Sequence, residues 1–156
     1  MELKDRIKII SGGQTGVDRA ALDFALSNKI ECGGWCPKGR KSEDGNIPAI
    51  YPLKETETAS YTERTKKNIE ESDGTLILFA NKLDRGTQLT YELCKSYAKP
   101  FLVLKLAEKS DLKKFKDWMV NNRIKTLNIA GPRESNEPGV YQFVLNFLNN
   151  LKPSEP

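Results

Sequence analysis

The sequence predicts an α/β domain with a three-layer Rossmann-like fold, in which helices cover both faces of a five-stranded parallel sheet. Five apolar, β-rich runs alternate along the chain with five segments of helical periodicity. The runs are apolar on both sides, which is typical of strands buried between two helical layers. A chain of 156 residues has room for one such domain, which we expect over residues 1–152, followed by a flexible tail at 153–156.

Each predicted strand is a short run that ends at glycine, proline or polar residues. The runs cover residues 7–10, 30–35, 75–79, 101–104 and 126–130. The second run is the weakest because Gly33 and Gly34 dilute it, and a weak strand suits the edge of a sheet. Right-handed crossovers permit two main strand orders, 3-2-1-4-5 and 2-1-3-4-5, of which the weak second strand favours the latter. In that order ligands bind between strands one and three, outside the carboxyl ends of the strands.

Apolar residues three or four positions apart predict the five helices. The helices cover about 17–28, 62–72, 87–97, 110–119 and 140–151, and the last carries the clearest apolar stripe. A long polar segment, 36–60, separates the second strand from the second helix. A loop of that length in a compact domain is usually functional or mobile.

The absence of histidine is the most informative feature of the composition. It excludes a His general base and His metal ligands within this chain, so that acid/base chemistry falls to carboxylates, Lys, Tyr or Cys. The 25 basic and 21 acidic residues leave a net charge of +4, which is ordinary for a soluble domain and does not favour a nucleic-acid partner. No stretch reaches the roughly 20 apolar residues of a membrane span, so we expect no membrane partner.

The three cysteines point to a reducing compartment. They cannot all pair, and the charged N-terminus lacks the apolar core of a signal peptide, so we expect a cytoplasmic protein. Cys32 and Cys36 have a spacing that could suggest a zinc or redox pair, but a second pair of ligands is missing. We therefore expect buried thiols near a strand end and no metal ligated by the protein.

The loop after the first strand, residues 12–19, holds three glycines within five residues. Without Cβ atoms, backbone N–H groups can approach an anion closely, and the following helix N-terminus adds partial positive charge. Phosphate is the natural ligand of such a turn, although the loop is neither a Walker A motif nor a clean dinucleotide-binding motif. The alternative is tight packing between strand and helix.

Two further loops are expected at the same edge of the sheet. Residues 81–87 follow the third strand and lead into a helix whose first turn offers Thr87, Gln88 and Thr90; residues 131–135 place Arg133 nearby. The alternatives are an ordinary capped turn and a solvated arginine.

Two other segments are candidates for the walls of a site. The second helix turns Thr65 and Asn68 toward the sheet where apolar residues are expected, so it either lines a site or is a weakly buried edge helix. In the long loop, Lys38, Arg40 and Lys41 could close over an anion, or they form a solvated charged run.

Seven motifs in order along nearly the whole chain resemble the family named "putative molybdenum carrier". They are GGQTGVDRAAL (12–22), GWCPKGR (34–40), YPLKET (51–56), RTKKN (64–68), SDGT (72–75), GTQLT (86–90) and NIAGPR (128–133). That family is similar to the molybdenum cofactor carrier proteins of algae and, more distantly, to the lysine decarboxylase-like, or SLOG, nucleotide-binding Rossmann proteins.

The resemblance implies a Rossmann-like domain that forms a homo-oligomer, a dimer or a tetramer. It also implies a phosphorylated ligand, either the molybdenum cofactor (molybdopterin) or a nucleotide. Gly12, Gly13, Thr15 and Gly16 would hold the phosphate, with Gly86 and Thr87 opposite. From the loops and the resemblance together, the expected ligand-binding residues are Gly12, Gly13, Gln14, Thr15, Gly16, Asp18, Arg19, Lys38, Arg40, Arg64, Asn68, Arg85, Gly86, Thr87, Thr90 and Arg133.

One departure from the distant relatives bears on catalysis. Relatives that cleave nucleoside monophosphates use a G-G-x-G-T-x-x-E loop, and Thr90 stands where that Glu would be. A hydroxyl cannot replace the carboxylate, and Glu92 lies about 200° further round the helix. The leading hypothesis is therefore a carrier-like binding protein without catalysis. The alternatives are a nucleotide-processing enzyme using Asp18, Asp84 or Glu92, and a ligand-sensing module.

Overall fold

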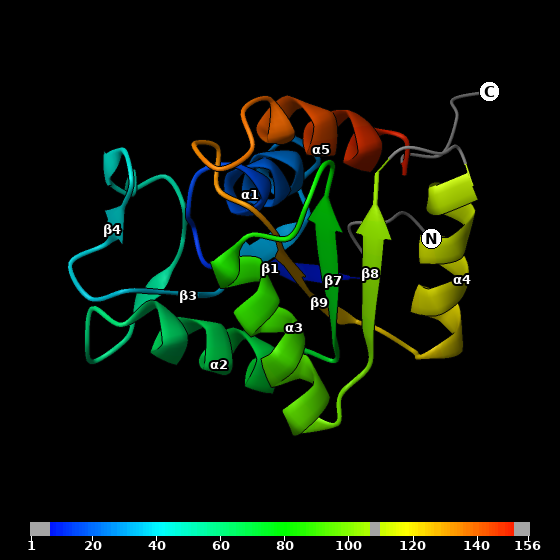
Figure 1. Cartoon of the computed structure of the whole chain (residues 1–156), viewed down its shortest axis with the longest axis horizontal. Helices are drawn as coiled ribbons and strands as arrows, with labels where there is room; N and C mark the ends of the chain where they lie inside the picture. The colour runs from blue at the N-terminus through cyan, green and yellow to red at the C-terminus, as the bar shows by residue number, and fades with distance from the viewer. Residues whose placement is uncertain (1–6, 107–109, 152–156) are drawn as a thin grey trace.

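A five-stranded, all-parallel sheet runs through the computed structural model, which describes residues 7–106 and 110–151 (Figure 1). Its strands are β1 (Lys8–Ile10), β2 (Glu31–Gly33), β7 (Gly74–Phe79), β8 (Phe101–Lys105) and β9 (Thr126–Ala130). The predicted tail at 153–156 lies outside the described residues. The α/β class and the parallel sheet are confirmed.

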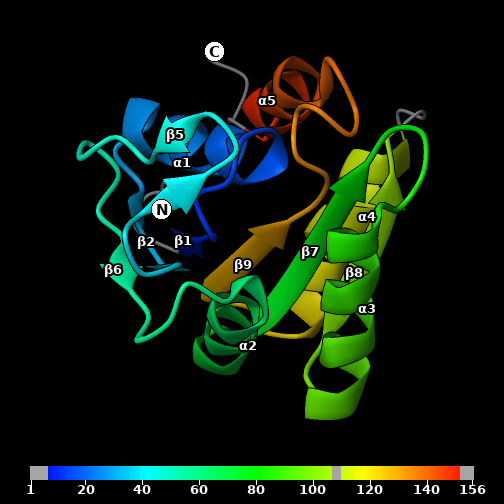
Figure 2. The same ribbon diagram turned by 60° about the vertical axis from the view of Figure 1, so that its left-hand side comes forward.

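Five helices cover the two faces of this sheet. They are α1 (Val17–Ser27), α2 (Tyr61–Glu71), α3 (Arg85–Tyr97), α4 (Ser110–Asn121) and α5 (Val140–Asn149). The helices α1, α4 and α5 share one face, and α2 and α3 pack together on the other (Figures 1 and 2). On the first face, the ring centres of Phe115 in α4 and Phe147 in α5 lie 6.2 Å apart. The predicted three layers are therefore present. In the described part of the chain no helix is both long and apolar enough to cross a membrane.

The place of the last strand corrects the predicted strand order. The order is β2-β1-β9-β7-β8, so the fifth strand lies between the first and the third instead of at the edge; the other four keep the predicted order 2-1-3-4. The exposure of the two strands agrees with this order, since Leu127 and Ile129 of β9 are at most 1% exposed and the first three residues of β8 are only half-buried. β8 also ends in the exposed Lys105, and lysine is typical of edge strands.

Moving β9 to the front of the chain restores a familiar topology. Counted from β9, the sheet order becomes 3-2-1-4-5, the doubly wound Rossmann order that was the other sequence-based alternative. The polypeptide therefore builds a Rossmann sheet but starts and ends at a different point along it.

The two faces of the sheet differ in polarity. Leu76 and Leu78 of β7 join the apolar core under α1, α4 and α5. The alternate residue Thr75 belongs to the other face, where its hydroxyl accepts a bond of 3.2 Å from the Asn128 side chain. The face under α2 and α3 is therefore partly polar, and it leads to the site described below.

The long segment 36–60 is more regular than its composition predicts. It contributes β4 (Lys41–Ser42), β5 (Gly45–Asn46) and β6 (Lys54–Glu55), and β6 pairs in parallel with β3 (Trp35–Cys36). The strands β4 and β5 form an antiparallel hairpin. The predicted second strand is correspondingly split at Gly34 into β2 and β3.

The third helix begins two residues earlier than predicted. Asp84 is its N-cap, because the Asp84 side chain accepts a hydrogen bond of 2.8 Å from the N–H of Thr87. Arg85 and Gly86 therefore belong to the first turn of α3 and not to the preceding loop.

Gly131, just after β9, tests how closely this strand fits between its neighbours. A Cβ atom there would lie 2.2 Å from the carbonyl oxygen of Leu78 and 2.6 Å from Cγ2 of Val17. We expect Gly131→Ala to lower the free energy of unfolding by about 1–3 kcal/mol in urea denaturation. Gly86→Ala is the control, because its nearest neighbour would be Asp84 Oδ1 at 3.8 Å, and equal stability of the two variants would contradict the packing described.

Candidate functional site

A cleft of about 610 Å³ opens at the carboxyl edge of the sheet. Its walls come from α2, from the first turns of α1 and α3, and from the loops after β1, β7 and β9. It is lined by Gln14, Asp18, Tyr61, Arg64, Thr65, Lys82, Leu83, Asp84, Arg85, Gly86, Thr87, Leu89, Thr90, Ala130, Gly131, Arg133 and Asn136. All three loops predicted from the sequence therefore contribute residues to this cleft.

The position of the cleft follows from the strand order. From the neighbouring strands β9 and β7 the chain continues to opposite faces of the sheet, into α5 and α3 (Figure 2). This is the topological switch point, where open α/β sheets bind ligands. It lies between the third and the fifth strand, and not between the first and third as predicted, because β9 separates β1 from β7.

Eight of the expected ligand-binding residues line this cleft. They are Gln14, Asp18, Arg64, Arg85, Gly86, Thr87, Thr90 and Arg133. Sequence reasoning missed Lys82, Leu83, Leu89 and Asn136 as lining residues, although the first two lie within the predicted loop 81–87 and the other two lie just beyond a predicted loop. With Lys82, the cleft has four basic side chains against the two carboxylates of Asp18 and Asp84, a balance that suits an anionic ligand.

The N-terminus of α3 faces the cleft with unused hydrogen-bond donors. Among the described residues none accepts a bond from the N–H of Arg85 or Gly86. The hydroxyl of Thr87 is buried and makes no hydrogen bond of ordinary distance and angle, in a residue only 2% exposed. It lies near enough to Asp84 to help lower the pKa of that carboxyl, but without such a bond it can still donate to a ligand. Buried polar groups are nearly always paired, so an unpaired hydroxyl beside open helix N–H groups indicates a place for an acceptor.

The N–H groups of the glycine-rich first loop donate hydrogen bonds mostly to other groups of the protein. The N–H of Gln14 donates to the Asp18 carboxylate over 3.2 Å, and the N–H of Val17 donates to the carbonyl of Pro132. A Cβ on Gly12 would lie 2.4 Å from the Arg64 guanidinium, and one on Gly16 would lie 2.4 Å from the Pro132 carbonyl. The glycines thus admit close neighbours, which is the packing alternative.

Four residues expected at the phosphate therefore lie behind the cleft wall. Gly12, Gly13, Thr15 and Gly16 are not among the lining residues. Their contact with a phosphate stays a prediction that this arrangement does not favour.

Asp18 is the most buried carboxylate in the cleft lining, at 3% exposure. Its Oδ2 accepts the N–H of Gln14 and lies 3.6 Å from Nη2 of Arg64. Burial raises the pKa of Asp18 to about 6, although Arg64 acts in the opposite direction. The Asp18 side chain is therefore ionised at neutral pH, but its ionised form is less stable than that of an ordinary aspartate.

The other two candidate catalytic carboxylates have different surroundings. Although burial of Asp84 acts in the opposite direction, hydrogen bonds from Thr87 and Asn136 hold its pKa below the usual value. Glu92 is exposed on α3 and accepts a bond from the Gln88 side chain. Glu92 lies outside the cleft, as its helical position predicts.

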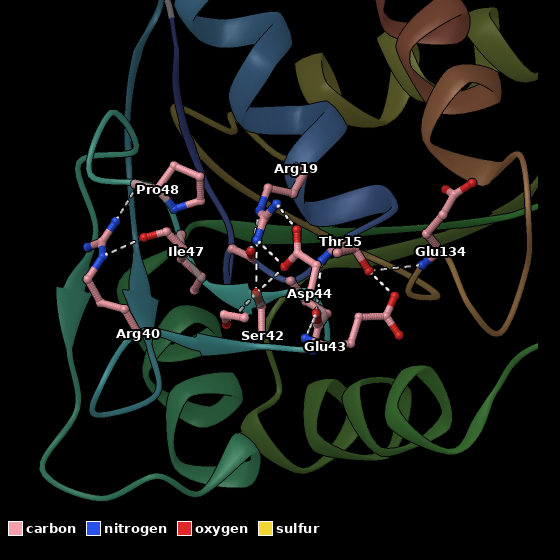
Figure 3. A network of polar contacts seen from close by, with 12 residues as sticks. Thr15, Arg19, Arg40, Ser42, Glu43, Asp44, Ile47, Pro48 and Glu134 are labelled. Carbon is pink, nitrogen blue, oxygen red and sulfur yellow. Dashed lines mark hydrogen bonds and ion pairs between the residues drawn. The ribbon is translucent and has the colours of Figure 1, made fainter.

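Two of the expected ligand-binding arginines instead hold the long loop (Figure 3). Arg19 donates from both terminal nitrogens to Asp44 at 3.0 Å and from Nε to the carbonyl of Gly13 at 2.8 Å. Arg40 donates to the carbonyls of Ile47, Pro48, Tyr51 and Leu53. Both guanidinium groups are therefore used within the protein.

The remaining expected residues also lie outside the cleft. The side chain of Asn68 binds the backbone of β3: it accepts a hydrogen bond of 2.8 Å from the N–H of Trp35 and donates one of 3.0 Å to the Trp35 carbonyl. Lys38 is exposed. Of the polar face of α2, Thr65 lines the cleft and Asn68 does not.

Glu43, at the tip of the β4–β5 hairpin, ties the hairpin to two loops at the cleft (Figure 3). Its carboxylate accepts bonds from the hydroxyl of Thr15 and from the N–H and hydroxyl of Ser135, and lies 3.6 Å from Nε of Arg133. The hairpin thus braces the cleft from the side.

The spacing of Cys32 and Cys36 does not produce a recognisable metal centre. Both cysteines are free, Cys36 is buried, and burial raises the pKa of each thiol. Within residues 7–106 and 110–151, no group of three or more His, Cys, Asp or Glu could hold a metal ion. A buried thiol at the end of β3 matches the simpler expectation.

The chain is similar to known proteins over most of its length. The model of the circularly permutated YpsA SLOG family matches residues 9–152. The crystal structure of a "putative molybdenum carrier protein" from Syntrophus aciditrophicus SB superposes with a TM-score of 0.90 and 46% sequence identity, covering 92% of this chain and 93% of that chain. Among curated proteins none is significantly similar in sequence.

The raised pKa of Asp18 makes a prediction about stability. The pKa of Asp18 is about 6 in the folded protein and has the ordinary value of 3.8 in the unfolded chain, so folding favours the protonated carboxyl. Asp18 therefore stabilises the fold at low pH, and this contribution is lost as the pH rises through about 6. Asparagine does not titrate. From pH 4 to pH 7, the free energy of unfolding of the wild type should therefore fall by about 2 kcal/mol relative to Asp18→Asn. Urea denaturation at both pH values measures this difference, and a constant difference would contradict the assigned environment.

Proposed function

The chain belongs to the circularly permutated YpsA SLOG family, and we propose on that premise that it is a carrier-like protein whose cleft binds a phosphorylated small molecule. The candidates are a phosphorylated pterin of the molybdenum cofactor type and a nucleotide. The name of the 46% identical relative supports the first, and the resemblance of the sequence to nucleotide-binding SLOG proteins supports the second. We expect a cytoplasmic homo-oligomer, as the sequence and the resemblance imply.

The unpaired hydroxyl of Thr87 is the observation that carries the proposal. It lies in the first turn of α3, next to the N–H groups of Arg85 and Gly86. A phosphate there would accept from all three groups and would be stabilised by the helix dipole. Arg85 and Arg133 line the same cleft and can balance the second phosphate charge.

The size and the apolar lining of the cleft suit a ligand with a ring. A volume of about 610 Å³ is within the usual range for small-molecule sites. Tyr61, Leu83 and Leu89 give the cleft an apolar surface beside its charged groups. A pterin or a purine carries both a flat ring and, when phosphorylated, an anionic end, so one ligand can use both parts.

We propose binding without catalysis, because the carboxylates are poorly placed for cleavage. Thr90, at the position of the relatives' Glu, donates to the carbonyl of Gly86 at 3.1 Å. Asp84 caps α3, and Glu92 lies outside the cleft. The nucleotide-processing alternative therefore depends on Asp18. Release of free base from nucleoside monophosphates, abolished in Asp18→Asn, would favour that alternative.

Calorimetric titration with AMP, GMP and molybdenum cofactor tests the proposal itself. We expect at least one of them to bind, and more tightly than the corresponding compound without phosphate. Absence of binding by all of them would contradict the proposed function.

Thr87→Val separates a ligand-binding role of this hydroxyl from a structural one. We expect about tenfold weaker binding of the phosphorylated ligand, because one hydrogen bond to a charged group is lost. We expect equal or higher stability in urea, because valine removes a buried hydroxyl that has no partner.

Thr75→Val is the matched control for that variant. The Thr75 hydroxyl is equally buried but accepts a bond from Asn128, so this variant should lose stability. Unchanged ligand affinity in Thr87→Val would contradict the assigned phosphate site.

A further inference from the structure

We infer that Asp18 makes the cleft selective for the amino-oxo-pyrimidine edge that guanine and pterin share, so that ligands with this edge bind more tightly than their adenine counterparts. The inference rests on the proposed function, since it requires the cleft to hold a phosphorylated heterocycle. It names the class of heterocycle within the ligands proposed above.

Asp18 has an oxygen to spare in the cleft. Its Oδ2 accepts the N–H of Gln14 and faces Arg64, whereas no described residue donates to its Oδ1. Each carboxylate oxygen can accept two hydrogen bonds, so even Oδ2 keeps capacity. A residue 3% exposed that lines a cleft and leaves an oxygen unbonded is suited to accept donors from a ligand.

The other carboxylate in the cleft, that of Asp84, already accepts a hydrogen bond on each of its oxygens. Asp84 Oδ1 accepts the N–H of Thr87 at 2.8 Å, and Asp84 Oδ2 accepts the side-chain amide of Asn136 at 2.8 Å. Those bonds hold the start of α3 to the loop after β9. Recognition of a ligand N–H therefore falls to Asp18.

The chemistry of the heterocycles then decides which ligand is preferred. Guanine and pterin present a ring N–H beside an exocyclic amino group, and these two adjacent donors match the two oxygens of one carboxylate. Adenine presents an amino group beside a ring nitrogen that is an acceptor, and this nitrogen would face the carboxylate without a hydrogen. Hypoxanthine has the ring N–H but lacks the amino group, so it should fall between them.

The cleft also offers contacts for the face of such a ring. Tyr61 lines the cleft with 44% of its surface exposed, and the Arg64 guanidinium lies 5.6 Å from its ring centre. Arg64 is the same residue that faces Asp18 at 3.6 Å. A ring that uses Asp18 at its edge is thus near groups that stack on aromatic faces.

Titration of the wild type with GMP, IMP and AMP tests the inference, because the three share ribose and phosphate and differ only in the base edge. We expect the affinities to fall in that order, with GMP roughly 5- to 100-fold tighter than AMP. A monophosphorylated pterin should bind with an affinity similar to that of GMP. Equal affinities, or a preference for AMP, would overturn the inference while leaving the proposed function intact; no binding by any of the four would contradict both.

Two variants assign the selectivity to one carboxylate. In Asp18→Asn the GMP to AMP affinity ratio should fall toward one, while AMP still binds and thereby reports a folded cleft. Glu92→Gln is the control, because Glu92 is a carboxylate that lies outside the cleft and the ratio should stay at its wild-type value. A wild-type ratio in Asp18→Asn, or a ratio lost in Glu92→Gln as well, would overturn the assignment to Asp18.

Discussion

The insertion of β9 between β1 and β7 is the constraint on which the site depends. It places the loop after β9 beside the loops after β1 and β7, and it makes β9 and β7 the neighbours whose chains continue to opposite faces. With β9 at the edge of the sheet, Asn136 could not reach Asp84 and Arg133 could not line the same cleft as Arg85. The absence of a Cβ at Gly131 permits this close fit.

The layers of the fold could be predicted from sequence, but the place of the last strand could not. Helical periodicity and apolar runs are local patterns, and they located all five helices and the five main strands. Strand order depends on which strands are buried by distant parts of the chain. The run at 126–130 looked no more central than the run at 101–104, although Ile129 is fully buried and Phe101 is not.

The candidate site shows the same division. The glycine, threonine and arginine motifs led to the edge of the sheet where the cleft opens, and Arg64, Arg85 and Arg133 line this cleft. Arg19 and Arg40 have the same chemistry, but they bind an aspartate and backbone carbonyls of the long loop. Which arginine remains available to a ligand depends on the acceptors that a folded loop presents, and a single sequence does not reveal them.

Three buried groups in the cleft are poorly satisfied by the protein alone: the hydroxyl of Thr87, Nε of Arg64, and the carboxylate of Asp18 with its raised pKa. Such groups cost stability and are typical of sites built for a ligand. A crystal structure of the protein with GMP tests this account most directly. The account predicts the phosphate within hydrogen-bond distance of the N–H groups of Arg85 and Gly86 and of the Thr87 hydroxyl. A phosphate held by the loop at Gly12 to Gly16, with the start of α3 empty, would contradict it.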